Sequence, residues 1–139
     1  MDIQSALKKG QSILIDNNII SAKLDSEILM SQAIRKNKKF IILNLHKEIK
    51  KRDLDYFGNL IQERAKSKPI AQIIKKKDFW KYEFIVNSNV LIPRPDTELI
   101  VEQVLNLTQN KSKLRILDIG TGSGCIILSI LKEKKNYKK

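Results

Sequence analysis

Three glycines at alternate positions, Gly120, Gly122 and Gly124, form the segment of this chain whose pattern best suits binding chemistry. A residue without a Cβ lets the backbone turn sharply and lets a ligand approach where a side chain would clash. The run Cys125–Lys134 that follows has the composition of a helix, and the amides at a helix N-terminus favour a polar or anionic group. The pattern therefore predicts a backbone cradle for a small polar ligand, with a structural tight turn as the alternative interpretation.

The spacing of these glycines favours S-adenosylmethionine over a dinucleotide. In the dinucleotide fingerprint the third glycine comes three positions after the second, and that position is Cys125 here. Glycines at 120, 122 and 124, with Asp118 two residues before the first, are instead spaced as in class I S-adenosylmethionine-dependent methyltransferases. In that class the loop passes under the methionine and ribose of the cofactor.

The loop needs a strand and a helix to hold it. Leu114–Ile119 is a short, mostly apolar candidate strand, so strand, glycine loop and helix follow one another as at the start of a nucleotide-binding α/β unit. A parallel strand of this kind is buried on both faces and needs neighbours, and the crossover to the next strand takes a dozen or more residues. Residues 132–139 contain five lysines and Glu133, which favours solvent. We therefore expect only the first strand and helix of such a domain.

The first half of the chain has the pattern of a helical bundle. Ile3, Leu7 and Leu14 recur at helical spacing, and the apolar residues between Leu54 and Ala65 step by three and four. Pro69 ends this region because proline cannot continue a helix. The pattern predicts one helical unit over residues 2–68.

The middle of the chain has the pattern of a hairpin followed by a helix. Residues 80–86 alternate between aromatic or aliphatic and other side chains, Asn87–Asn89 suits a turn, and Val90–Ile92 suits a second strand, which predicts a hairpin over 79–92. Pro93 and Pro95 prevent the second strand from extending. The helix that follows has an expected buried stripe consisting of Ile100, Val104 and Leu107, flanked by Val101 and Leu105.

Composition excludes several functional classes. The chain has 139 residues and a formal charge of +12, but only five of its 27 basic residues are arginines, so we expect a solvated lysine-rich surface and no specific nucleic-acid face. One cysteine and one histidine cannot supply a structural zinc site, and no metal is expected. The sequence shows no apolar run of membrane-spanning length and no readable secretory signal, so we expect a cytoplasmic protein that does not bind membranes.

Two segments taken together carry a family resemblance. Leu91–Glu98, which contains the Pro-Arg-Pro run, and Leu117–Gly124, which contains the glycine loop, closely resemble the HemK family of protein-(glutamine-N5) methyltransferases. Weaker matches at Asp25–Leu29, Pro69–Ala71 and Asp78–Trp80 extend the resemblance over essentially the whole chain. The family modifies class I peptide chain release factors.

The resemblance implies an α plus α/β architecture. Residues 1–70 would be a helical domain that helps to grip the release factor, residues 71–95 a linker with a β-hairpin, and residues 96–139 the beginning of a Rossmann-like methyltransferase domain. The methyl group would pass from S-adenosylmethionine to the glutamine of the release factor's Gly-Gly-Gln motif, and the protein would be a monomer.

Matching positions also imply the site residues. The residues that would contact S-adenosylmethionine are Gly120, Thr121, Gly122, Ser123 and Gly124, with Asp118 beside them. Arg94, Asp96 and Glu98 match a segment that packs beside the active site in the family. Their alternative role is structural, as a rigid turn, a helix cap and a partner of the helix dipole.

The sequence also departs from the family. The Asn-Pro-Pro-Tyr motif, which holds the substrate amide, does not occur in these residues, so no catalytic residue is expected in the chain. The acidic ribose-binding residue should follow the loop by about 20 positions by analogy with other doubly wound folds, and that position is Lys138. Lys75 follows Ile74 where the family usually has Thr-Gly. We therefore expect a truncated fragment that is inactive alone and binds the cofactor weakly or not at all.

Two other functions remain open at this point. An N6-adenine nucleic-acid methyltransferase would share the same motif, because an exocyclic amine poses a similar chemical problem. The helical domain could also act without catalysis, as a module that binds a release factor or the ribosome.

Overall fold

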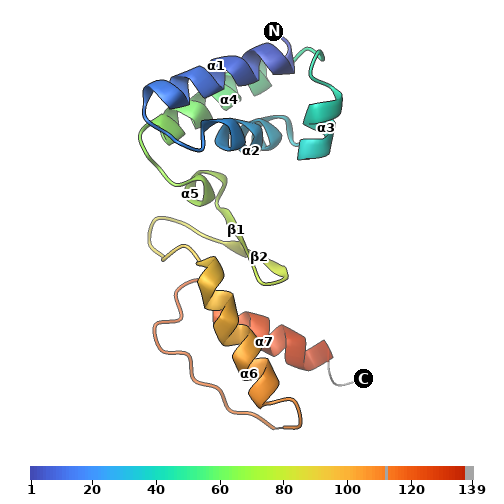
Figure 1. Ribbon diagram of the computed structural model, residues 1–139, viewed down its shortest axis with the longest axis vertical. Helices are drawn as coiled ribbons and strands as arrows, with labels where there is room; N and C mark the ends of the chain where they lie inside the picture. The colour runs from blue at the N-terminus through green and yellow to red at the C-terminus, as the bar shows by residue number, and fades with distance from the viewer. Residues whose placement is uncertain (112, 137–139) are drawn as a thin grey trace. The chain divides into compact units, whose positions relative to one another are not determined.

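The computed structural model describes residues 1–111 and 113–136 of the chain. It divides into two compact units, Met1–Ile74 and Lys75–Lys139 (Figure 1). The first unit is entirely helical apart from an isolated bridge between Asp2 and Glu48, and the second contains a β-hairpin and helices. Mostly helical structure with one hairpin confirms that part of the expected architecture.

The first unit is built from five helices, as the helical periodicity of its sequence predicts. They are α1 (Ile3–Asp16), α2 (Ala22–Ile34), α3 (Lys38–Leu43), α4 (Lys51–Ala65) and α5 (Ile70–Ile74). The short helix α5 begins directly after Pro69, and its residues 71–74 fall in the range 71–95 that we had expected to be a linker. It packs against α2 and α4 and so belongs to the helical unit.

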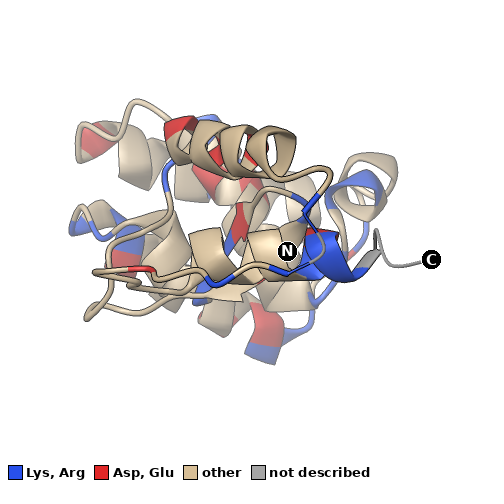
Figure 2. Cartoon of the chain, turned by 90° about the horizontal axis from the view of Figure 1, so that it is seen from below, with Lys and Arg blue, Asp and Glu red and all other residues tan. Residues whose placement is uncertain are grey.

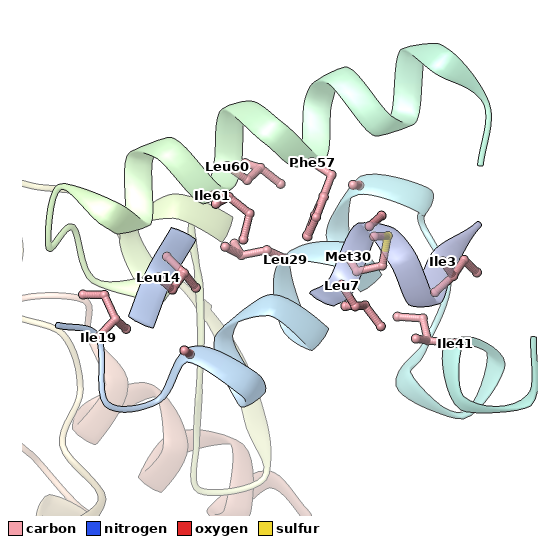
Figure 3. Close-up of a cluster of buried hydrophobic side chains, with 13 residues drawn as sticks. Ile3, Leu7, Leu14, Ile19, Leu29, Met30, Ile41, Phe57, Leu60 and Ile61 are labelled. Carbon is pink, nitrogen blue, oxygen red and sulfur yellow. The ribbon is translucent and has the colours of Figure 1, made fainter. Parts of the chain in front are cut away.

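Apolar side chains from α1 to α4 meet in one core (Figure 3). Leu14, Leu29 and Met30 are fully buried there. Helices α1 and α4 approach closely at Gly10, because a Cβ at this position would lie 2.8 Å from Cζ of Phe57. The absence of a side chain at Gly10 therefore allows the Phe57 ring to enter the core.

A buried ion pair joins α2 to the end of α4. Asp25 accepts a hydrogen bond from Nε of Arg64 at 2.7 Å and another from the Ser21 hydroxyl at 2.7 Å. The two charged side chains are only 6% and 17% exposed. Arg64 also donates through Nη1 to the carbonyl of Lys68 at 3.1 Å, which fixes the chain where it leaves α4.

The second unit contains the hairpin and two longer helices. Strands β1 (Lys76–Phe79) and β2 (Tyr82–Ile85) pair antiparallel, with Lys76 opposite Ile85 and Phe79 opposite Tyr82. A short 3-10 helix, η1 (Pro95–Thr97), leads into α6 (Glu98–Leu107), and α7 (Cys125–Asn136) follows the glycine loop. The buried residues of its core are Phe79, Phe84, Val101, Leu105, Cys125 and Ile130.

The hairpin register that we predicted is wrong. The turn lies at Trp80 and Lys81, and residues 90–92 do not form a strand. This turn lets Phe79 and Phe84 both face the core, where their rings meet edge to face with centroids 6.1 Å apart. The polar segment Asn87–Asn89 does turn, through a hydrogen bond from the Asn89 amide to Oδ1 of Asn87, but it lies beyond β2.

The strand predicted at Leu114–Ile119 is also absent from the described residues. Two of its apolar side chains face solvent almost fully, with Leu117 83% and Ile119 87% exposed. A strand of a parallel sheet needs hydrogen-bonding neighbours, and no described segment pairs with this one. Local composition alone therefore does not make residues 114–119 a strand.

The stripe predicted for α6 is displaced by one position. Val101 and Leu105 are buried, whereas Ile100 and Leu107 are exposed. The expectation that solvent surrounds Glu133 is wrong as well, because this residue is only 6% exposed. Among the described residues, no helix is long and apolar enough to cross a membrane.

The ion pair between Asp25 and Arg64 gives a prediction about stability. Arg64→Ala should lower the free energy of unfolding by about 3 kcal/mol, because it leaves a buried carboxylate without its counter-charge. Urea unfolding followed by far-UV circular dichroism measures this change. Lys68→Ala is the matched control, since its pair with Glu63 is 43% and 44% exposed, and such pairs contribute about 0.5 kcal/mol. An equal loss of unfolding free energy in the two variants would show that burial does not strengthen the pair between Asp25 and Arg64.

Candidate functional site

The glycine loop adopts a left-handed backbone at each of its three glycines. The φ angles of Gly120, Gly122 and Gly124 are 75°, 55° and 75°. A residue with a Cβ is strained in this region, whereas glycine enters it freely. The alternation seen in the sequence therefore corresponds to three places where the backbone favours glycine.

Hydrogen bonds within the loop connect it to the start of α7. The Thr121 hydroxyl donates to Oδ2 of Asp118 at 3.0 Å, and the Gly124 amide donates to the Thr121 carbonyl at 2.8 Å. The Leu128 amide donates to the Gly124 carbonyl at 2.9 Å, which begins the helix. Asp118 thus shapes the loop, and Ser123 lies within it, half-buried.

The loop has room beside its first two glycines. A Cβ at Gly120 would meet no atom within 4 Å, and one at Gly122 would meet only the Gly120 carbonyl oxygen at 3.9 Å. A Cβ at Gly124 would instead lie 3.1 Å from Cδ1 of Leu128. The space where side chains are absent at Gly120 and Gly122 fits the approach of a ligand, and the glycine at 124 serves the packing of the helix.

The segment before α6 holds the other predicted site residues. Arg94 and Asp96 are exposed at η1, and the described residues give neither side chain a hydrogen bond or ion pair. Glu98, the first residue of α6, accepts a hydrogen bond from the Trp80 amide at 2.7 Å. The structure therefore gives Glu98 a contact with the hairpin turn and does not bring these three residues together with the loop.

Sequence reasoning missed Glu133, the most buried charged side chain among the described residues of the second unit. Its carboxylate accepts hydrogen bonds from Nε1 of Trp80 at 3.2 Å, Nζ of Lys81 at 3.0 Å and the hydroxyl of Tyr82 at 2.9 Å. The hydrogen bond from Lys81 holds the pKa of Glu133 below its usual range, and burial raises the pKa of Tyr82. A signal was present, because Cys125, Ser129 and Glu133 are four residues apart and so share one helix face.

The remaining expectations concern metal ions, charge and the ribose. In the part of the chain that the structure describes, no group of three or more potential metal ligands gathers. Basic residues occur on many elements, and acidic residues are interspersed among them (Figure 2). Lys138, at the expected position of a ribose-binding acid, lies outside the described residues.

Comparison with known proteins connects the helical unit to a family. The family described as "PrmC N-terminal domain" matches residues 5–74. This match covers α1 to α5, apart from the first residues of α1, and it ends where the first compact unit ends.

Individual relatives extend the similarity beyond that unit. The chain is 40% identical over 138 residues to a release factor glutamine methyltransferase of Clostridium acetobutylicum, which covers 99% of this chain and 48% of the relative. It is 38% identical over 138 residues to the protein of the same name from Buchnera aphidicola, covering 99% and 50%. A bifunctional methyltransferase of Rickettsia felis is 32% identical over 163 residues, covering 98% and 31%. The chain spans about half the length, or less, of these relatives.

The loop conformation predicts that alanine is tolerated poorly at the glycines. Gly120→Ala should lower the free energy of unfolding by about 1 kcal/mol, the cost of a left-handed backbone alone. Gly124→Ala should lower it further, because the new methyl group also crowds Leu128. Urea unfolding followed by the fluorescence of Trp80, the single tryptophan of the chain, measures both effects in this unit.

The double variant Gly124→Ala, Leu128→Ala separates the two causes when compared with Leu128→Ala alone. In that background the alanine at 124 should cost only as much as Gly120→Ala, because the crowding has been removed. Unchanged stability in both single variants would show that the loop does not hold the left-handed conformation.

Proposed function

The chain belongs to the PrmC N-terminal domain family, and we propose that it forms the first half of a release factor glutamine methyltransferase. In this proposal the helical unit contacts a class I release factor, and the glycine loop binds S-adenosylmethionine. The methyl group passes to the side-chain amide nitrogen of the glutamine in the Gly-Gly-Gln motif. The observation that carries the proposal is the left-handed loop with open space at Gly120 and Gly122, in a chain whose helical unit matches this family.

The residues of the loop fit this cofactor. A backbone without side chains at Gly120 and Gly122 leaves room for the methionine and ribose portion to lie against it. The N-terminus of α7, directly after Gly124, adds amides that favour polar groups. When bound, S-adenosylmethionine supplies an electrophilic methyl group on a sulfonium, and the loop's task is to hold and orient it.

The acceptor nitrogen explains what else such an enzyme requires. An amide nitrogen is a poor nucleophile because its lone pair is delocalised into the carbonyl. The enzyme must therefore align it with the methyl group and accept hydrogen bonds from its N–H groups. In the family we assign this task to the Asn-Pro-Pro-Tyr motif, which the 139 residues do not contain. The proposed activity thus needs residues equivalent to the unmatched half of the relatives.

A chimera tests the proposed activity. Residues 1–139 would replace the matching half of the Clostridium acetobutylicum relative, and methyl transfer from labelled S-adenosylmethionine to a release factor would be measured. We expect the chimera to methylate the glutamine. Gly120→Val in the chimera should raise KM for the cofactor about tenfold, which corresponds to about 1.4 kcal/mol of lost binding.

Gly58→Ala is the control for the chimera, because a Cβ at this exposed helical position meets no atom within 4 Å. It should leave KM for the cofactor unchanged. A folded chimera that transfers no methyl group, or a Gly120→Val variant with an unchanged KM, would contradict the proposal.

A second candidate function is binding without catalysis, and the division of the chain favours it. Met1–Ile74 is a compact unit with its own core, and the family match ends at its boundary. We expect residues 1–74 to capture a purified class I release factor in a pull-down assay. Gly10→Phe, which would displace Phe57 from the core, should abolish capture, whereas Gly58→Ala should retain it. Failure of both the 1–74 fragment and the full chain to bind would exclude this function.

A further inference from the structure

We infer that Glu133 is a positioning residue that holds the glycine loop in register with the turn of the hairpin. The inference deepens the proposed function and rests on it in one respect, namely that the loop is where the cofactor binds. Glu133 itself lies on α7, eight residues after the first residue of that helix, and therefore acts through the helix.

Three consecutive residues at the hairpin turn donate hydrogen bonds to the Glu133 carboxylate. Trp80, Lys81 and Tyr82 are consecutive residues, and each donates a side-chain hydrogen bond to Glu133 over 2.9–3.2 Å. The carboxylate is buried, so each donor replaces water that it has lost. No other described acidic side chain in this unit accepts hydrogen bonds from more than one residue.

An uninterrupted stretch of helix α7 connects this carboxylate to the loop. The helix begins at Cys125, directly after Gly124, and contains neither glycine nor proline before Glu133. Glu133 therefore lies about 12 Å along the axis from the start of the helix, at 1.5 Å per residue. An uninterrupted helix moves as one body, so we expect a shift at Glu133 to displace the first turn of α7 as well. Cys125 in that first turn packs in the same core as Phe79 and Phe84.

A second glutamate accepts a hydrogen bond from the same turn. Glu98, the first residue of α6, accepts the Trp80 amide at 2.7 Å, and Trp80 has a left-handed φ of 58°. This carboxylate stabilises a conformation that a tryptophan otherwise avoids. Helix α6, which follows the Pro-Arg-Pro segment, and helix α7, which follows the glycine loop, thus each contribute a glutamate that is hydrogen-bonded to the same hairpin turn.

The charge of Glu133 distinguishes this role from simple packing. A buried carboxylate stabilises a fold poorly compared with an apolar side chain of similar size, so its value lies in the geometry that its donors impose. Because the hydrogen bond from Lys81 lowers the pKa of Glu133, the carboxylate is charged at neutral pH and accepts all three hydrogen bonds. This arrangement is lost only as the pH falls through that lowered pKa, below the ordinary range of a glutamate.

Other ionisable groups lie near Glu133 or in the loop, and their effects must be distinguished from that of Glu133. Lys132 places its ammonium 4.2 Å from the centre of the Tyr82 ring, and Lys134 donates to the Thr108 carbonyl. Asp118 accepts a hydrogen bond from the Thr121 hydroxyl within the loop. The effect of Glu133 is therefore defined as a titration that the Trp80 indole and the loop share, because the Trp80 indole donates directly to the Glu133 carboxylate.

Amide NMR spectra of the full chain test the inference. Glu133→Gln keeps the size of the side chain and removes its charge, and Glu102→Gln on exposed α6 is the matched control. We expect Glu133→Gln to shift the Trp80 indole resonance together with the amides of Gly120, Gly122 and Gly124. Gly10 and Gly58 in the helical unit should not move, and Glu102→Gln should move none of these signals.

Hydrogen exchange gives a second readout of the same effect. The amides of Gly124 and Leu128 should exchange about tenfold faster in Glu133→Gln, the factor that loss of one hydrogen bond to a charged group produces. In the wild-type chain, the Gly124 resonance should follow the Trp80 indole with one shared acidic midpoint. This titration keeps the test decisive if Glu133→Gln does not fold.

The outcomes separate this inference from the proposed function. A shift confined to Trp80, or a Gly124 resonance that does not titrate with it, would overturn the positioning role. Titration of the wild-type chain with S-adenosylmethionine tests the loop's ligand separately. Coupled resonances without cofactor binding would support the role of Glu133 and count against the loop as a cofactor site in this chain.

Discussion

A buried carboxylate that accepts hydrogen bonds from a second element organises each of the two units. In the helical unit, Asp25 on α2 accepts a hydrogen bond from Arg64 at the end of α4. In the other unit, Glu133 on α7 accepts a hydrogen bond from Lys81 in the hairpin turn. Apolar contacts tolerate sliding and rotation, whereas a carboxylate removed from water must meet its donors at fixed distances. These two side chains therefore fix the register of elements that the apolar cores only bring together.

The second unit combines this order with strain and exposed apolar surface. Strand β1 lies between two residues with left-handed backbone, Lys75 and Trp80, at φ angles of 58°. Lys75 occupies the place where the HemK family usually has glycine, so a residue with a side chain carries a conformation that glycine adopts without strain. The Glu98 carboxylate stabilises Trp80, and the Lys75 carbonyl accepts the Val86 amide at 3.2 Å.

The second unit also exposes several apolar side chains around the glycine loop. Leu117 and Ile119 before the loop, and Leu128 and Leu131 on α7, face solvent in the described residues. In the proposed enzyme these side chains would pack against further strands and helices. This interpretation is consistent with the length of the relatives, of which the chain spans about half. The loop keeps its left-handed glycines without such a sheet, since hydrogen bonds within the loop and to α7 hold it.

The sequence by itself determined the features that depend on neighbouring residues. Helical spacing identified the bundle of the first unit, and the alternation around Phe84 and Val86 identified buried residues of the hairpin region. The glycines at 120, 122 and 124 marked a loop that turns sharply, and all three have left-handed φ angles. Tertiary structure alone decided the position of the hairpin turn, the absence of a strand at 114–119 and the donors that Glu133 meets. Each of these depends on partners far away in the chain, because strand pairing needs a second strand and the donors to Glu133 lie more than 50 residues before it.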